Sequence, residues 1–436
     1  MVKVNPFRGI TYNKEKVDCL DDVMSPPYDI ISPEMQNELY EKHPYNFVRL
    51  ILGKQKPKDN SENNRYTRAK KYFETWLKES ILIEQDKTAI FPYKINYKVK
   101  SQKYTMNGFF VLLKLDPDYK LVKAHERTLS TPKADRLNLL RECKTNFEPI
   151  ELLYIDKKNS IQKMIEKSTN QPFVSVKGYD GFTHSLWILK DKSIISEIKE
   201  FLKDKTLFIA DGHHRYQTAI DFANEMKNKP GNYDENASFN YRMVILVNIF
   251  DKGLSILPTH RLIKMANVDF KSFFTNLKKY FIIEEKTIKN SYKNYEIISR
   301  RIKEELETKI EHKFALYHKD RFFIMTLKDE KVMDKFAVDH SNVWRTLDVS
   351  ILHKIILEDL LGINEKNLED HVRYTRDDVE AIKFVNERKY DFSFLMNATK
   401  IEELRAIAEA GEHMPQKSTY FLPKMLSGLV MYKMDN

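Results

Sequence analysis

Residues 206–226 read TLFIADGHHRYQTAIDFANEM. The apolar run TLFIA, with the β-branched Ile209, predicts a buried strand. Beyond Gly212 the apolar side chains recur at helical spacing, at Ala219, Phe222, Ala223 and Met226. The segment therefore predicts a strand, a tight turn and a helix, and the other blocks of the chain are interpreted around it.

The predicted turn carries Asp211, Gly212, His213, His214 and Arg215. Gly212 is one of only 11 glycines, which indicates a steric demand for positive φ or close approach. A helix N-terminus presents free N–H groups and partial positive charge, so imidazoles and a guanidinium beside it indicate a phosphate site. Asp211 would bind Mg²⁺ or accept a substrate proton. Alternatively, Asp-Gly is an ordinary turn, Asp211 caps the helix and the histidines are solvated.

The composition of the whole chain limits its class. The length of 436 residues allows two or three domains, and 42% hydrophobic residues with a mean hydropathy of -0.55 predict a soluble protein with a sizeable core. The net charge of +10 is spread along the chain, so a diffuse lysine-rich surface is expected rather than a nucleic-acid site. Cys19 and Cys143 are isolated, and no segment has the apolar length of a leader or a membrane span. We expect a cytoplasmic protein without a membrane partner.

The choice of basic residue points to further functional positions. Only 18 of the 73 basic residues are Arg, so an Arg in this chain indicates that a planar, forked donor was needed. Arg127, Arg215 and Arg261 each lie within two residues of a histidine. They define two clusters besides the 211–215 turn, namely His125-Glu126-Arg127 and His260-Arg261.

The cluster at 125–127 is stronger evidence for a functional site than the pair at 260–261. His125, Glu126 and Arg127 offer a base, a metal or proton acceptor and a phosphate clamp, although a solvated loop can have the same residues. The pair His260-Arg261 follows a strand-rich segment, and by itself a capping or ion-pair role would be the better interpretation.

The remaining pattern predicts elements and a boundary. Ser32 and Pro33 predict the N-cap and first position of a helix that runs to about Lys42, and residues 46–52 (NFVRLIL) predict a strand. The pattern of charged and apolar residues changes after residue 265. We therefore expect a catalytic region over 1–265 and an α+β region over 266–436. There is no GxGxxG, HExxH or GxSxG motif and no four-ligand metal spacing.

Six blocks in order carry a family resemblance: PFRGI at 6–10, PPYDIIS at 26–32, HERTL at 125–129, IADGHHRYQTA at 209–219, PTHR at 258–261 and MPQKSTYFLPK at 414–424. On these blocks the chain is identified as a member of the family of domain of unknown function 1015. The 211–215 turn also resembles the signature turn of the ParB/sulfiredoxin-like superfamily. That superfamily includes DNA-clamping CTPases, a peroxiredoxin-repair ATPase and free-serine kinases.

The resemblance implies a mixed α/β (α+β) fold with a ParB/sulfiredoxin-like core that holds a nucleotide or phosphate at the turn. Members of the family are often encoded beside serine-biosynthesis genes, which implies serine or phosphoserine as substrate. We therefore expect Mg²⁺-assisted phosphoryl transfer on a small phosphorylated metabolite, by a phosphoserine phosphatase or by a serine kinase that uses ATP or ADP.

We expect the three clusters to meet in one cleft. The predicted catalytic residues are Asp211, His213, His214, Glu126 and His125, with Asp211 also the metal ligand. The predicted phosphate-binding residues are Arg215, Arg127, Gly212, His260 and Arg261. Either Glu126 or a histidine would act as base, and a phosphohistidine at His213 remains an alternative.

Two other classes of function remain open. A ParB-like nucleic-acid-binding module is compatible with a pI of about 9.1, but the sequence has no basic, aromatic-studded face or helix-turn-helix segment that would support it. A sensor that binds a phosphorylated metabolite without converting it is the other. The sequence leaves the oligomeric state open.

Overall fold

The most apolar segment of the chain lies inside a large sheet. Strand β12, Tyr241–Asn248, is buried along its whole length. It pairs in parallel with β8, Ile150–Tyr154, and antiparallel with β5, Gln102–Lys114. A strand with neighbours on both sides and covered faces needs no polar side, which accounts for the continuous apolar run.

The computed structural model describes residues 1–99, 102–126, 130–229, 234–265, 269–286, 294–307 and 311–435. These form two compact units. The first contains Met1–Ala124, the segment from the helix at 130 to Ser255, and the C-terminal residues from Pro423. The second contains His125, Glu126 and Ile256–Leu422. The assignment of catalysis to 1–265 and of a separate region to 266–436 stays a prediction.

The first unit is organised around a nine-stranded mixed sheet with the order β6-β11-β8-β12-β5-β4-β10-β9, in which β1 also pairs with β5. The strands not yet given are β1 Val4–Asn5, β4 Phe91–Val99, β6 Val122–Lys123, β9 Val174–Lys177, β10 Thr183–Leu186 and β11 Leu207–Asp211. Strand β11 is parallel to β6 and antiparallel to β8. Two small sheets pair β2 Ile10–Tyr12 with β3 Leu82–Glu84, and β7 Thr145–Asn146 with β21 Tyr432–Lys433.

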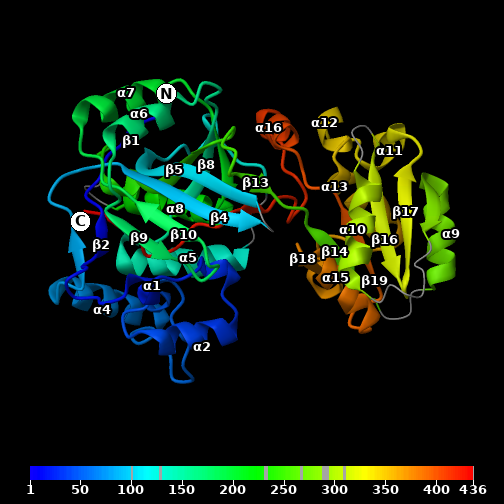
Figure 1. Ribbon diagram of the computed structural model, residues 1–436, viewed down its shortest axis with the longest axis horizontal. Coiled ribbons are helices and arrows are strands. Elements are labelled where there is room, and N and C mark those ends of the chain that lie inside the picture. The colour runs from blue at the N-terminus through cyan, green and yellow to red at the C-terminus, as the bar shows by residue number, and fades with distance from the viewer. Residues whose placement is uncertain are drawn as a thin grey trace. The chain divides into compact units, whose positions relative to one another are not determined.

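The helices of the first unit lie around this sheet (Figure 1). They are α1 Leu20–Val23, α2 Pro33–Lys42, α3 Val48–Ile51, α4 Arg65–Lys78, α5 Ser130–Cys143, α6 Ser160–Ser168, α7 Lys192–Leu202 and α8 His213–Lys227, with 3₁₀ turns at Tyr28–Ile30 and Ser238–Asn240. In Figure 1, α2 and α4 lie farther from the sheet than α5 and α8. Helix α5 packs against α8 and α4, and α6 packs against α7. Helix α8 also contacts β8, so the helix after the 211–215 turn rests on the strand next to its own.

The second unit has a six-stranded sheet with the order β15-β17-β16-β19-β14-β18, whose neighbouring strands all run antiparallel. Its strands are β14 His260–Ile263, β15 Phe281–Lys286, β16 Lys313–His318, β17 Arg321–Leu327, β18 Val372–Thr375 and β19 Phe392–Met396. One face packs against α10 Tyr295–Leu306 and α15 Asp378–Asn386, where Ile302, Tyr317 and Ile382 belong to one buried cluster. Aromatic contacts such as Phe273 on Phe392 seat α9, Phe270–Tyr280, on this sheet as well.

The remaining helices of the second unit lie between residues 330 and 409. They are α11 Met333–Phe336, α12 Asn342–Arg345, α13 Asp348–Ile351, α14 Leu368–His371 and α16 Ile401–Glu409, with a 3₁₀ turn at Glu330–Val332. Helix α13 continues as a π-helix, η4, over Leu352–Leu360. Short strands lie at β13 Ser255–Ile256 and β20 Phe421–Leu422.

The expectation of a mixed α/β fold is confirmed, and so is the start of α2, where the Ser32 side chain accepts from the Met35 N–H and Pro33 is the first helical residue. The strand predicted at 46–52 is wrong, because residues 48–51 form α3. Asn46 Oδ1 accepts from the Val48 N–H at 3.0 Å, which turns the chain into a helical turn that a short apolar run cannot reveal. Among the described residues, none of the helices combines the length and apolar character of a membrane crossing.

Candidate functional site

The turn between β11 and α8 has the geometry that the sequence predicts. Strand β11 ends at Asp211, Gly212 has a φ of +93°, and α8 begins at His213. A Cβ on residue 212 would lie 3.0 Å from Nε and 3.2 Å from Cζ of Arg215. Two features therefore require glycine at position 212: the positive φ, and the close approach of the Arg215 guanidinium to the turn.

Asp211 lies between two cations. Arg215 Nη2 donates to Oδ2 of Asp211, and Lys424 Nζ donates to Oδ1 at 2.5 Å. Burial alone would raise the pKa of Asp211, but Lys424 and Arg215 outweigh it and hold this pKa well below its usual range. Asp211 is thus an ionised carboxylate that fixes the positions of an ammonium and a guanidinium beside the N-terminus of α8.

Lys424 is the buried lysine of this arrangement. Its side chain is 9% exposed, whereas Asp211 is 21% exposed. Burial would lower the pKa of Lys424, but Asp211, and Asp29 to a smaller extent, raise it above the ordinary value, so the ammonium stays charged. In the sequence, Lys424 is only the last residue of the 414–424 block. Its ion pair with Asp211 spans 213 residues, so no local pattern could predict it.

Glu151 is a second carboxyl next to Asp211 that sequence reasoning missed. It lies on β8, where it is the register partner of Asp211 across the antiparallel β11–β8 pair. Both of its carboxyl oxygens are buried without a hydrogen-bond partner among the described residues. Burial raises the pKa of Glu151 to about 8, with a further contribution from the Asp211 charge, while Lys424 and Arg215 act in the opposite direction. The available signal was a Glu inside the otherwise apolar strand Ile150–Tyr154.

The two histidines of the turn occupy the first two positions of α8. His213 is 6% exposed, and its charge contributes to the lowered pKa of Asp211. His214 is partly exposed. The structure therefore brings four of the predicted site residues to the Asp211 turn, namely Gly212, His213, His214 and Arg215.

The 125–126 block belongs to the second unit and meets the 414–419 segment there. His125 is buried, and its Nε2 lies 3.0 Å from Oγ1 of Thr419. Thr419 Oγ1 also donates to Glu126 Oε1 at 3.3 Å, and the Met414 N–H donates to the His125 carbonyl at 2.7 Å. Arg127 lies outside the described residues.

His260 and Arg261 are side by side on β14 of the second unit. His260 Nε2 donates to Asp378 Oδ1 at 2.9 Å, and its Nδ1 accepts from the Met396 N–H at 3.3 Å, so both ring nitrogens have partners within the unit. Arg261 is 1% exposed, and its Nη2 lies 3.4 Å from both the Lys417 carbonyl and His353 Nε2. Burial lowers the pKa of Arg261 to about 10.

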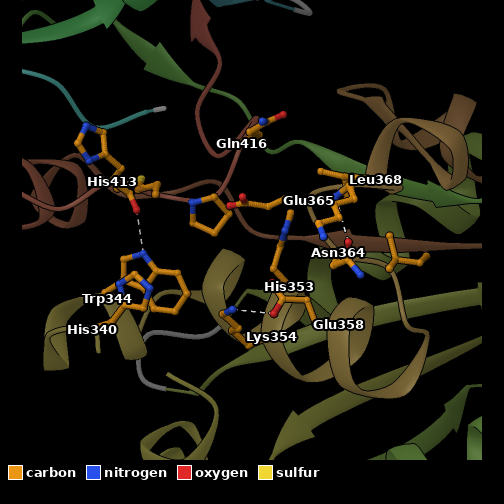
Figure 2. Close-up of a pocket in the computed structure, with 14 residues that line it drawn as sticks. His340, Trp344, His353, Lys354, Glu358, Asn364, Glu365, Leu368, His413 and Gln416 are labelled. Carbon is orange, nitrogen blue, oxygen red and sulfur yellow. Dashed lines mark hydrogen bonds and ion pairs between the residues drawn. The ribbon is translucent and has the colours of Figure 1, made fainter. Parts of the chain in front are cut away.

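A pocket in the second unit is lined by His353, the histidine that lies 3.4 Å from Arg261 (Figure 2). His353 comes from the π-helix η4, and the pocket is also lined by a stacked pair formed by His340 and Trp344, whose ring centroids are 3.8 Å apart. Burial, Arg261 and Lys354 lower the pKa of His353 well below its usual value, so the ring is neutral. Short π-helical segments often occur at functional sites, which makes this pocket a second binding candidate.

The predicted blocks are therefore distributed over both units. The 125–126 and 260–261 blocks both contact the 414–419 segment in the second unit, through Thr419 and Lys417. The 211–215 block lies in the first unit with Lys424 and Glu151. That all three blocks meet in one cleft stays a prediction. In the described part of the chain, no group of three or more His, Cys, Asp or Glu side chains is arranged to hold a metal ion.

The fold and the site define a mixed α/β protein whose first unit presents a charged strand–turn–helix site. The model of the family described as "Protein of unknown function (DUF1015)" matches residues 4–350. The chain belongs to this family. A search of curated proteins gave no match.

Several solved structures are weakly similar. A free serine kinase in complex with AMP is 13% identical with a TM-score of 0.36, over 75% of this chain and 91% of that chain. A conserved hypothetical protein from Pyrococcus furiosus is 14% identical with a TM-score of 0.32, over 74% and 95%. SbnI with a C-terminal truncation, from Staphylococcus aureus, is 11% identical with a TM-score of 0.33, over 72% and 85%.

Proposed function

We propose that this chain is a phosphoryl-transfer enzyme that acts on serine or phosphoserine, as a nucleotide-dependent kinase or as a phosphatase. The observation that carries the proposal is the Asp211 turn, where an ionised carboxylate fixes Arg215 and Lys424 beside the N-terminus of α8. Phosphoryl transfer depends on positioned positive charge around the phosphoryl oxygens more than on covalent chemistry.

The phosphate would be held by the first turn of α8 and by the cations around Asp211. Gly212 has no side chain that could cap the helix, so an anion would supply the acceptor for the backbone N–H groups of the first turn. Arg215 and Lys424 add two fixed positive charges. In this role the turn would work as the ParB/sulfiredoxin-like signature does, which is the part of the proposal that rests on the sequence resemblance.

Glu151 is the group that we propose as proton acceptor in place of Glu126. Its pKa of about 8 is close to the range in which a general base works at neutral pH. In the kinase reaction the serine hydroxyl oxygen attacks the terminal phosphorus of ATP or ADP, the bond from that phosphorus to the nucleotide oxygen breaks, and the hydroxyl proton passes to the base. In the phosphatase reaction a water oxygen attacks the phosphorus of phosphoserine, the bond from that phosphorus to the serine oxygen breaks, the water proton passes to the base, and the serine oxygen takes up a proton as phosphate is released.

Mg²⁺ would be held by Asp211. A single protein carboxylate suffices when phosphate oxygens and water complete the coordination, as is common for this ion, so the missing cluster of further ligands among the described residues is compatible with it. The ion would neutralise charge on the phosphoryl oxygens. Arg215 and Lys424 donate to the two carboxylate oxygens of Asp211, so the ion would share these oxygens with them. The two cations would supply part of the positive charge that neutralises the phosphoryl oxygens.

The decisive experiment is to incubate the purified protein and Mg²⁺ with O-phosphoserine, with and without ADP, and to assay phosphate, serine and ATP. Free phosphate and serine without nucleotide indicate the phosphatase, and serine with ATP indicates the kinase run in reverse. The Asp211→Asn variant is the negative control.

Two outcomes would contradict the proposal. Salt-sensitive DNA binding without turnover of phosphate compounds would favour the nucleic-acid-binding module. A rise in melting temperature with O-phosphoserine, without product, would identify a sensor.

A further inference from the structure

Three buried arginines line one small pocket of the first unit, and the proposed reaction uses only one of them. They are Arg136 of α5, Arg215 of α8 and Arg242 of β12, and Glu148 and Thr218 line the same pocket. Each of the three arginines is at most 7% exposed. Guanidinium groups are seldom buried in this number unless carboxylates or a ligand neutralise them.

The carboxylates nearby do not neutralise all three. Asp135 is shared by Arg136 and Arg65, and Asp211 is shared by Arg215 and Lys424. Glu148 is the remaining carboxyl at the pocket, and its Oε2 is 3.6 Å from Arg136 Nη1. One carboxyl cannot pair with three guanidinium groups.

Arg242 has no ion-pair partner among the described residues. Its Nη2 donates to the Glu148 carbonyl at 3.1 Å, and its Nε is buried without a hydrogen-bond partner there. Burial, together with Arg215 and Arg136, lowers the pKa of Arg242 to about 9, although Glu148 acts in the opposite direction. An unpaired buried cation of this kind is costly for the protein, so a missing counter-anion is the simplest explanation.

Two other donors at the pocket also lack hydrogen bonds. Arg136 Nη1 and Thr218 Oγ1 are both buried without a hydrogen-bond partner in the described part of the chain. Together with Arg242 Nε they are three unsatisfied donor positions, and one tetrahedral or planar oxyanion can accept from several donors at once. Leu139, Leu140, Thr145 and Phe147 line the rest of the pocket, so its unsatisfied donors come from the arginines and Thr218.

We infer that this pocket between α5, α8 and β12 binds one small oxyanion, the phosphate or carboxylate group of a substrate or free inorganic phosphate. Arg215 belongs both to this pocket and to the Asp211 turn, so an anion bound here lies beside the proposed reaction centre. The inference does not rest on the proposed function, because binding of an anion needs no turnover.

The test is a thermal-shift titration of the full chain with inorganic phosphate, at an ionic strength held constant with chloride. The wild type should show a saturable rise in melting temperature. In Arg242→Met the affinity for phosphate should fall at least about tenfold. The melting temperature of Arg242→Met without phosphate should equal or exceed that of the wild type, because an unpaired buried charge has been replaced by an apolar side chain.

The matched control is Arg141→Met. Arg141 lies on the same helix as Arg136, is 46% exposed and pairs with Glu225, so this variant should keep the full phosphate response. If Arg242→Met does not fold, Thr218→Val removes one unsatisfied hydroxyl with little change in volume and should weaken phosphate binding several-fold.

Further titrations identify the source of the anion. A response to L-serine assigns the pocket to a carboxylate, and a response to phosphate and O-phosphoserine but not to L-serine assigns it to a phosphate group. The absence of a saturable response to all three overturns the inference. A phosphate response that survives in Arg242→Met and is lost in Gly212→Ala also overturns it, because the anion then lies at the N-terminus of α8. If the wild type binds phosphate as expected but turns over neither serine nor phosphoserine, only the proposed function is contradicted.

Discussion

Asp211 and Glu151 are register partners on the adjacent antiparallel strands β11 and β8. The pKa values of their two carboxyl groups are shifted in opposite directions. Lys424 and Arg215 keep Asp211 ionised, whereas Glu151 is buried without a hydrogen-bond partner among the described residues and has a raised pKa. Neighbouring titratable groups whose pKa values are pushed apart are typical of sites with an acid–base task. The first predictions concern this pair.

Asp211→Asn should reduce turnover of the phosphoserine reaction by about 1000-fold or more, because Arg215 and Lys424 lose the charge that positions them. The same change leaves two largely buried cations uncompensated, and this should lower the free energy of unfolding by about 3–5 kcal/mol. Steady-state kinetics and urea denaturation measure the two effects. Unchanged turnover would remove the Asp211 turn from the chemistry.

Glu151→Gln should change the pH dependence of stability. The folded pKa of Glu151, about 8, lies above that of the unfolded chain, so between about pH 4.3 and 8 the folded state holds a proton that the unfolded state has lost. The free energy of unfolding therefore falls as pH rises through this window, on the order of a few kcal/mol in total. The Gln variant should lack this loss and should exceed the wild type in stability at pH 9.

Glu151→Gln also tests the role of this carboxyl as proton acceptor. Turnover of the wild type should rise with pH with an apparent pKa near 8, since only the ionised carboxylate accepts a proton. The variant should be slow at every pH. A wild-type profile that is flat between pH 7 and 9, or a variant with the wild-type profile, would rule Glu151 out as the base.

Gly212→Ala should reduce both turnover and stability. The new Cβ would lie 3.0 Å from Arg215 Nε at a backbone φ of +93°, so Arg215 has to move away from Asp211. Gly181→Ala is the matched control in the same unit, because Gly181 has a φ of +77° and nothing within 4 Å of an added Cβ. Both variants should lose about 1–2 kcal/mol to backbone strain, and only Gly212→Ala should lose activity. Equal activity in the two variants would contradict the assigned position of Arg215.

Lys424→Met should make the protein more sensitive to acid. Asp211 has a depressed pKa in the folded state, so it contributes stability that is present above its unfolded pKa and is lost as pH falls through its folded value. Without Lys424 that pKa rises, and the loss begins at higher pH. The midpoint of acid unfolding, followed by circular dichroism, should move upward relative to the wild type and to Lys433→Met, which changes an exposed lysine of the same C-terminal segment. Identical midpoints for the two variants would show that Lys424 does not stabilise the ionised Asp211.

The strand–turn–helix at 207–227 and the helix that starts at Pro33 could be predicted because their signals are local. An apolar run, a glycine at the turn and a stripe at helical spacing act within a few residues, and so does a Ser N-cap before a Pro. The use of Arg instead of Lys beside histidines also indicated structured positions, since Arg215 and Arg261 are both buried and hydrogen-bonded. The run at 46–52 shows the limit, because Asn46 forms hydrogen bonds to residues of another segment, Asp22 and Met24, and so the chain turns into a helix there.

By itself, then, the sequence determined the mixed α/β class, the family and the Asp211 turn, because each of these can be read from short blocks of neighbouring residues. Only the tertiary structure decided which groups surround Asp211. Glu151 reaches it through strand register, Lys424 through a contact that spans 213 residues, and Arg242 joins Arg136 and Arg215 through the packing of three elements. The pKa of a buried carboxyl or the charge balance of a pocket depends on distances between side chains that are remote in the chain, and such distances exist only once the strands have paired and the helices have packed.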